Sequence, residues 1–329
     1  MKKVLLPLAV ALLVTWSCEN PEAPEVNQQE KVKVTIPDIL QNTRRSGRGR
    51  VEVELAETLN STLFANSSIK ITEICIHRKL DPIASVEVLD KQFERTLTSR
   101  WVPGDERRDW NGDGDLNDID WLSFTPLATA NGVIDATPIY RAMYKKWEKG
   151  GFCKNVDIDE TAYDLSMGNP SLILGIGGLP PAANPLSDVS VIGFIPAFIF
   201  ELVFGEPNVL GVAFSFVFID ENGDPTVTNF GKEDKAFTEV WFNDGFPWSI
   251  GPTPTSIDLE SVILHEFGHT MNLGHFGALI EFTFASGTTK LIYKPVNTMN
   301  AIYIGEPRNF LGLNDRSNYC LSWGTWPWK

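Results

Sequence analysis

The sequence has few of the side chains that bind metals or cross-link a chain: four histidines and four cysteines in 329 residues. Charged residues make up only 21%, and 43% are hydrophobic, which excludes a wholly disordered chain. Basic residues are in deficit, 28 Lys and Arg against 42 Asp and Glu, so the formal net charge is −14. A chain this acidic lacks the cationic field that nucleic acid and anionic lipid surfaces require, and we expect no nucleic-acid partner.

Long apolar runs are also missing. Val4–Trp16 is shorter than the ~20 residues of a spanning helix, and after Lys2 and Lys3 it is typical of a signal peptide. The run ends in Ser17-Cys18, which resembles a bacterial lipoprotein signal with Cys18 as the lipidated residue. We therefore predict a signal peptide (1–17), a Pro- and Glu-rich tether (18–30), and an exported protein lipid-anchored to the outer membrane or cell surface. The anchor would be its only membrane contact. A secreted or periplasmic protein is the alternative.

A lipidated Cys18 leaves three cysteines, which allow at most one disulfide. Cys153 and Cys320 both lie in loop-like surroundings, so we predict a possible bridge between them. Cys75 lies in an alternating, strand-like run, where a small buried residue is the simpler interpretation.

The chain is long enough for one large domain or two modest ones. Short alternating runs predict strands at Lys31–Ile36, Arg50–Leu55 and Ile69–Ile76, within an N-terminal extension of uncertain structure (31–95). Ile139–Lys149 predicts a helix with a Pro near its start and one apolar face. Further strands are expected at Gly211–Asp220 and Thr238–Asp244.

Three of the four histidines lie between residues 265 and 275. His265 and His269 are four residues apart, so on a helix both imidazoles project from one face and can reach a single Zn²⁺ at ~2.0–2.1 Å. Glu266 lies beside the first of them and is the candidate general base. His275 completes the ligand set if the chain turns back near Asn272, a residue type that tolerates the left-handed conformation. The fourth histidine, His77, is predicted to be an ordinary strand residue.

The segment His265–His275 resembles the extended zinc signature of the metzincin metallopeptidases, in particular their matrixin-like branch. Asn297-Thr298-Met299-Asn300 resembles the Met-turn that lies beneath the zinc in that family. The similarity covers roughly residues 130–329. It implies an α+β catalytic domain (96–329) with a twisted mixed sheet, a zinc-binding helix and a Met-turn at Met299.

The resemblance implies a monomeric zinc endopeptidase that hydrolyses peptide bonds of a protein or peptide, with Glu266 taking a proton from a zinc-activated water. One alternative is a surface lipoprotein that binds a glycan or protein, with a structural or vestigial zinc site. Another is a zinc hydrolase acting on a non-peptide bond. Glu266 favours an enzyme, because a structural site has no need of a base. Residues 19–95 are a candidate cover for the cleft.

An acidic loop at Asp109–Asp120 has the spacing of a calcium site. Oxygen-bearing side chains occupy positions 1, 3, 5, 7, 9 and 12, with Gly114 at position 6: Asp109, Asn111, Asp113, Asp115, Asn117 and Asp120. The loop resembles EF-hand and dockerin-type loops, with Asp120 in place of the usual Glu. We predict a structural Ca²⁺ here, against the alternative of a solvated acidic turn.

Overall fold

The computed structural model describes residues 34–35, 51–80, 91–149, 153, 156–228, 231–251, 253–283 and 286–326. The predicted signal peptide (1–17), the tether (18–30) and Cys18 lie outside the described residues. Within the described ranges, no helix combines the length and apolar character needed to cross a membrane. The fold described below belongs to the unit that runs from Val32 to Lys329.

A mixed sheet forms the centre of this unit, with strand order β17-β2-β11-β12-β10-β5-β8, and β4 adds to β12. β12, β10, β5 and β8 are parallel, β11 runs antiparallel between β12 and β2, and β17 is parallel to β2. Its strands are β2 (Ile69–Lys79), β4 (Ser99–Arg100), β5 (Ile119–Ser123), β8 (Ile158–Glu160), β10 (Val189–Ile195), β11 (Val209–Phe218), β12 (Glu233–Asn243) and β17 (Ile302–Tyr303). The predicted α+β class is confirmed.

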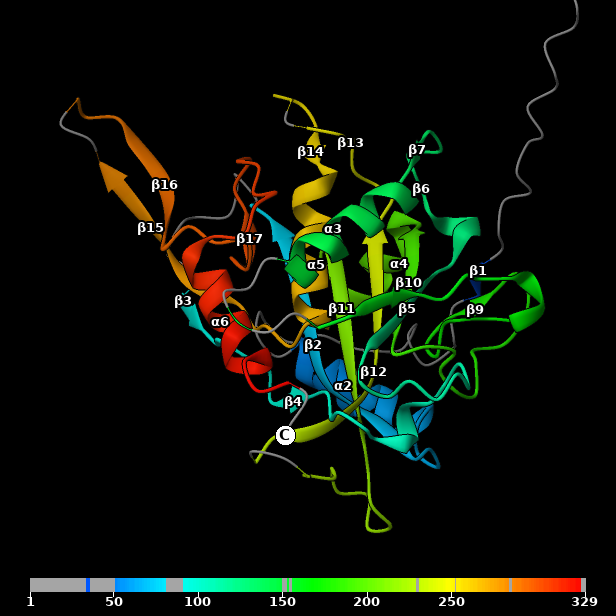
Figure 1. The fold of residues 1–329 in the computed structure, drawn as a ribbon. Helices are drawn as coiled ribbons and strands as arrows, with labels where there is room; N and C mark the ends of the chain where they lie inside the picture. The colour runs from blue at the N-terminus through cyan, green and yellow to red at the C-terminus, as the bar shows by residue number, and fades with distance from the viewer. Residues whose placement is uncertain are drawn as a thin grey trace, which may run out of the picture. The chain divides into compact units, whose positions relative to one another are not determined.

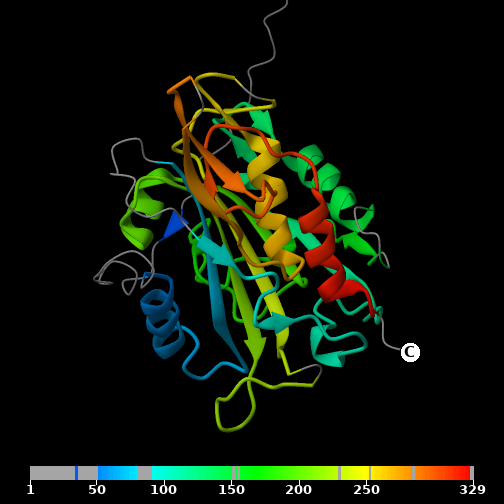
Figure 2. The ribbon, with the colours of Figure 1, turned by 90° about the vertical axis from the view of Figure 1, so that its left-hand side faces the viewer.

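Helices cover both faces of the sheet (Figures 1 and 2). α3 (Thr137–Lys149), α5 (Leu259–Thr270) and α6 (Leu313–Trp323) lie on one face, and their apolar side chains share one core cluster. α2 (Val51–Thr62) and α4 (Ala197–Phe204) lie on the other face and share the second cluster. Because both faces are covered, every residue of β10 and β11 is buried.

Shorter strands form small sheets around this centre. A three-stranded sheet has the order β16-β15-β3, and its β15–β16 hairpin projects at the left of Figure 1. The short strands are β1 (Val34–Thr35), β3 (Lys91–Phe93), β6 (Thr129–Ala130), β7 (Ile134–Asp135), β9 (Gly175–Ile176), β13 (Trp248–Ser249), β14 (Ile257–Asp258), β15 (Phe276–Thr283) and β16 (Thr289–Lys294).

Most of the expected elements are present, with one error. The predicted helix is α3, and the strands expected at Ile69–Ile76, Gly211–Asp220 and Thr238–Asp244 are β2, β11 and the end of β12. The strand predicted at Arg50–Leu55 is wrong, because Val51–Thr62 is a helix. The alternating Val-Glu-Val-Glu start suggested a strand, but the buried residues are Val51, Leu55 and Leu59, which recur at helical spacing.

The segment predicted as an N-terminal extension shares sheets with the rest of the chain. β2 pairs with β11 over most of its length, and β3 pairs with β15 directly after His275. The described residues on the two sides of the expected boundary at 95/96 therefore belong to the same sheets.

Candidate metal centre

α5 carries the histidine motif and is fixed at both ends. Asp258 caps its N-terminus, and its carboxylate accepts the backbone N–H of Ser261 at 3.2 Å. Beyond the helix, Asn272 has φ 67°, and its N–H donates to the carbonyl of His269 at 3.0 Å. The turn predicted near Asn272 is therefore confirmed, and it brings His275 back toward the helix.

The Nε2 atoms of the three histidines converge. The distance from His265 to His269 is 3.1 Å, and the distances from His275 to each of them are 3.2 Å. In a tetrahedral site with N–Zn distances of ~2.0–2.1 Å, nitrogen ligands are about 3.3–3.4 Å apart. The triangle thus has the size that one zinc ion requires.

The other ring nitrogen of each histidine has a carbonyl partner. Nδ1 of His265 donates to the carbonyl of Thr298 at 2.8 Å, and Nδ1 of His269 to that of Leu273 at 2.8 Å. Nδ1 of His275 donates to Oε1 of the Gln92 side chain at 2.9 Å. A carbonyl oxygen only accepts, so each Nδ1 carries the proton and each neutral ring presents an Nε2 lone pair.

Three lone pairs facing one another repel unless a cation lies between them. Burial also lowers the pKa of His265 and His275 well below the usual range and that of His269 to about 4, so the rings stay neutral. The donor set, its spacing and its tautomers fit a zinc ion, which binds neutral imidazoles.

Glu266 is fully buried beside this triangle. Among the described residues, two groups of three side chains bring possible metal-ligand atoms within 4.8 Å of one another. One is the histidine triad, and the other consists of His77, His265 and Glu266. In the described structure neither Glu266 oxygen has a hydrogen-bond partner. Burial raises the pKa of Glu266 well above its usual range. A buried carboxylate without a donor indicates a position where water or a ligand belongs.

His77 is not the ordinary strand residue that the sequence predicts. It is buried on β2, and its ring stacks on that of His265 with centroids 3.7 Å apart and planes at 17°. Its Nδ1 lies 3.8 Å from Oε1 of Glu266. No local signal identifies His77 or Gln92 as members of the site, because both arrive through strand pairing with distant parts of the chain.

Met299, where the sequence predicts the Met-turn, packs against α5 at Gly268. A Cβ built on Gly268 would overlap the Met299 sulfur and lie 2.9 Å from a ring carbon of Trp147, so only glycine fits at that point of α5. The carboxylate of Asp315 accepts the backbone N–H groups of Thr298 at 3.0 Å and Met299 at 3.3 Å. These contacts fix the turn whose Thr298 carbonyl orients His265.

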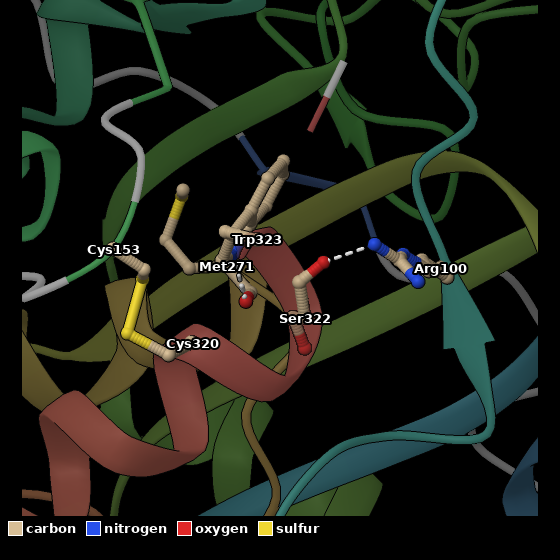
Figure 3. Close-up of a disulfide and its surroundings, with 6 residues drawn as sticks. All are labelled: Arg100, Cys153, Met271, Cys320, Ser322 and Trp323. Carbon is tan, nitrogen blue, oxygen red and sulfur yellow. Dashed lines mark hydrogen bonds between the residues drawn. A yellow bond between two sulfur atoms is a disulfide. The ribbon is translucent and has the colours of Figure 1, made fainter. Parts of the chain in front are cut away.

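α6 contacts the C-terminal end of α5 (Figure 3). Trp323 donates through Nε1 to the carbonyl of Met271 at 2.9 Å, and the Arg100 guanidinium donates to the carbonyl of Ser322. A disulfide joins Cys153 and Cys320, with Cα atoms 5.6 Å apart, so the pairing favoured by the sequence is present. Cys75 is a free cysteine on β2.

The acidic loop folds around its own backbone. Gly112 and Gly114 have φ of 75° and 78°, and Oδ1 of Asp109 accepts the N–H of Gly114 at 3.2 Å. Asn111 donates to Asp113 at 2.7 Å and to Asp120 at 2.8 Å, so three of the six predicted ligands lie together. Asp115 accepts the N–H of Asn117 at 3.1 Å. The loop is tightly turned, with Asp109, Asp113 and Asp115 exposed and Asp120 buried.

Comparison with known proteins gives no relative: no family model matches the chain, and no curated protein does.

Proposed function

We propose that the chain is a zinc-dependent endopeptidase of the metzincin type, matrixin-like, with His265, His269 and His275 as metal ligands. The observation that carries the proposal is the convergence of three unprotonated Nε2 atoms, 3.1–3.2 Å apart, beside the carboxylate of Glu266. The mixed sheet, the turn at Asn272 and the methionine under Gly268 support it. Export, a lipid anchor at Cys18 and a structural Ca²⁺ in the 109–120 loop are further parts of the proposal.

A bound zinc supplies a Lewis acid that polarises the scissile carbonyl and acidifies the attacking water. Glu266 takes the proton of that water on a carboxylate oxygen and returns it to the leaving amine nitrogen. Burial raises the pKa of Glu266, which makes its carboxylate a stronger proton acceptor for the first of these transfers. Thr298, Leu273 and Gln92 hold the three imidazoles through their Nδ1 atoms.

One observation favours the alternative of a structural or vestigial zinc site in a binding lipoprotein. His265, His269 and Glu266 are 0% exposed, and His275 is 7% exposed, so in this form no substrate reaches the centre. A buried zinc site formed by three neutral imidazoles can serve stability alone. The presence of Glu266 next to the three histidines opposes a purely structural role, because neither of its carboxylate oxygens has a hydrogen-bond partner in the described chain.

Three proteins separate the two functions: wild type, Glu266→Gln and, as a matched control on the same helix, Glu260→Gln. Glu260 accepts a hydrogen bond from Asn309 at 2.8 Å and is half-buried. Zinc content and hydrolysis of casein and a peptide library are measured on each protein, intact and after limited proteolysis. We expect one zinc per chain in all three, and at least about 10²-fold slower hydrolysis for Glu266→Gln alone. Equal hydrolysis by wild type and Glu266→Gln after limited proteolysis would contradict the proposal.

A further inference from the structure

β2 crosses the histidine site between two other segments. It pairs antiparallel with β11, from Ile69 opposite Phe218 to Arg78 opposite Val209. At its C-terminal end it also pairs parallel with β17, with Arg78 opposite Ile302. The stretch around His77–Lys79 is therefore held on both sides, next to the metal centre.

Backbone hydrogen bonds secure this stretch. Lys79 donates to the carbonyl of Asn208 at 2.8 Å, Arg78 to that of Ala301 at 3.2 Å, and Leu80 to that of Tyr303 at 2.9 Å. A peptide bound in extended form along a strand edge uses bonds of this kind. β2 thus lies across the site as an extended chain with the hydrogen bonds that a bound peptide would form.

The two faces of β2 have different contacts. Ile74 and Ile76 belong to the core cluster shared with α2, on the far side of the sheet. Because side chains alternate along a strand, Cys75 and His77 point to the other face, where His77 reaches His265 and Glu266. Ala213, the partner of Cys75 on β11, belongs to the cluster on the α5 side. The polar face of β2 therefore covers the metal centre.

The ring of His77 takes the space that a scissile peptide needs. A reacting carbonyl must come within about 3–3.5 Å of the attacking group, here beside Glu266 and the metal ligands. The His77 ring lies 3.7 Å from that of His265 and 3.8 Å from a Glu266 oxygen. Arg78, the next residue, pairs with Glu52 of α2 at 2.8 Å and Glu206 at 2.7 Å, which fixes the strand in this place.

We infer that β2 is an inhibitory strand: it occupies the edge of β11 along which an extended peptide substrate binds, and its release opens the metal centre. This inference rests on the proposed endopeptidase function. It explains why a site with the donor set of a hydrolase is buried in the intact chain. No disulfide in the described structure ties β2 to the rest of the chain, since Cys75 is free. A cut between Leu80 and Lys91 would leave α2 and β2 attached by non-covalent contacts alone.

Cys75 allows a reversible test of release. Cys75 and Ala213 are directly opposed on β2 and β11, where antiparallel Cβ atoms lie about 4.5–5.5 Å apart, so Ala213→Cys can cross-link the two strands on oxidation. The matched control is Ala213→Cys with Cys75→Ser, which has the same β11 substitution and no partner thiol. Both chains receive a recognition site for a sequence-specific protease between Leu80 and Lys91, and both are cut.

Three quantities are measured on the cut proteins: retention of residues 1–80 by native size-exclusion chromatography, the rate of zinc extraction by EDTA, and hydrolysis of a peptide library. We expect the control to lose residues 1–80, and to exceed the cross-linked chain at least about tenfold in both rates, because only the open fraction is competent. Mild reduction should release the cross-linked chain. Reduction of the Cys153–Cys320 bridge affects both proteins alike.

Equal and measurable hydrolysis by intact, cross-linked and released chains would overturn the inhibitory role of β2 and leave the peptidase proposal standing. Retention of residues 1–80 after cutting, with zinc extraction unchanged, would show that β2 is a permanent strand and overturn the inference. Release of β2 with faster zinc extraction and no hydrolysis would refute the endopeptidase function, while the covering role of β2 would stand.

Discussion

Nδ1 of His275 is hydrogen-bonded to Oε1 of Gln92, at 2.9 Å, although the two residues are 183 positions apart in the chain. β3 brings them together, because Gln92 pairs with Gly277 two residues after the histidine. The bond fixes both the tautomer and the orientation of His275. A residue far upstream of the histidine motif therefore belongs to the candidate metal centre.

Gln92→Leu should weaken zinc binding about 10–100-fold, the usual effect of removing a partner of a ligating histidine. Gln92→Glu should retain most of the affinity, because a carboxylate also accepts the Nδ1 proton. Competition with a chelator of known affinity measures both variants. A wild-type zinc affinity in Gln92→Leu would show that the bond does not orient His275.

Gly268→Ala should destabilise the fold by about 1–3 kcal/mol, as expected for an added methyl in a packed core. The new Cβ meets the Met299 sulfur and the Trp147 ring. Met299→Leu, which keeps the volume nearly unchanged, should cost less than about 1.5 kcal/mol and serves as the control. Urea denaturation gives both values. A neutral Gly268→Ala would mean that Met299 does not pack under α5 as described.

Glu239 should make stability depend on pH. It is buried on β12, and burial raises its pKa from 4.5 to about 7, although Ser171, Leu172 and Trp241 donate hydrogen bonds to it. Between these two pKa values the folded chain binds more protons than the unfolded chain, so the free energy of unfolding falls as pH rises. Above the pKa of Glu239 in the folded chain, its contribution to the free energy of unfolding is lost completely.

The pH effect is isolated by comparison with Glu239→Gln, which cannot titrate. The stability of wild type relative to this variant should decrease as the pH rises from 4.5 to about 7. Thermal or urea unfolding across that range measures the difference. A difference that does not change with pH would refute the assignment of a raised pKa to Glu239.

Calcium should stabilise the chain through the 109–120 loop. At a free concentration 100 times the Kd, one site adds about 2.7 kcal/mol, which chelation removes. Asp113→Ala should abolish this effect, because Asp113 is one of the predicted ligands and shares the donor Asn111 with Asp120. The control is Asp224→Ala, which removes one negative charge from an exposed turn. An equal calcium response in Asp113→Ala and wild type would leave the loop as a solvated acidic turn.

The sequence predicts those parts of the centre that depend on local geometry. The spacing of His265 and His269 requires only a helix, and the return of His275 requires only that Asn272 adopt a positive φ, which it does. The sequence motif also indicates Met299, although its contact with Gly268 needed the structure.

What the sequence does not reveal depends on long-range pairing. His77 and Gln92 reach the site because β2 pairs with β11 and β3 pairs with β15, and no pattern within residues 69–93 specifies those partners. The same limit explains the error at Val51–Thr62. Alternation over the six residues Arg50–Leu55 predicts a strand, but burial of Leu55 and Leu59 against a distant sheet face selects a helix.

The most direct test of the metal centre is anomalous diffraction at the zinc absorption edge from crystals of the full chain grown with Zn²⁺. The structure predicts one peak, ~2.0–2.1 Å from each Nε2 of His265, His269 and His275. No peak between these three nitrogens, or a peak bound instead by His77 and Glu266, would contradict it.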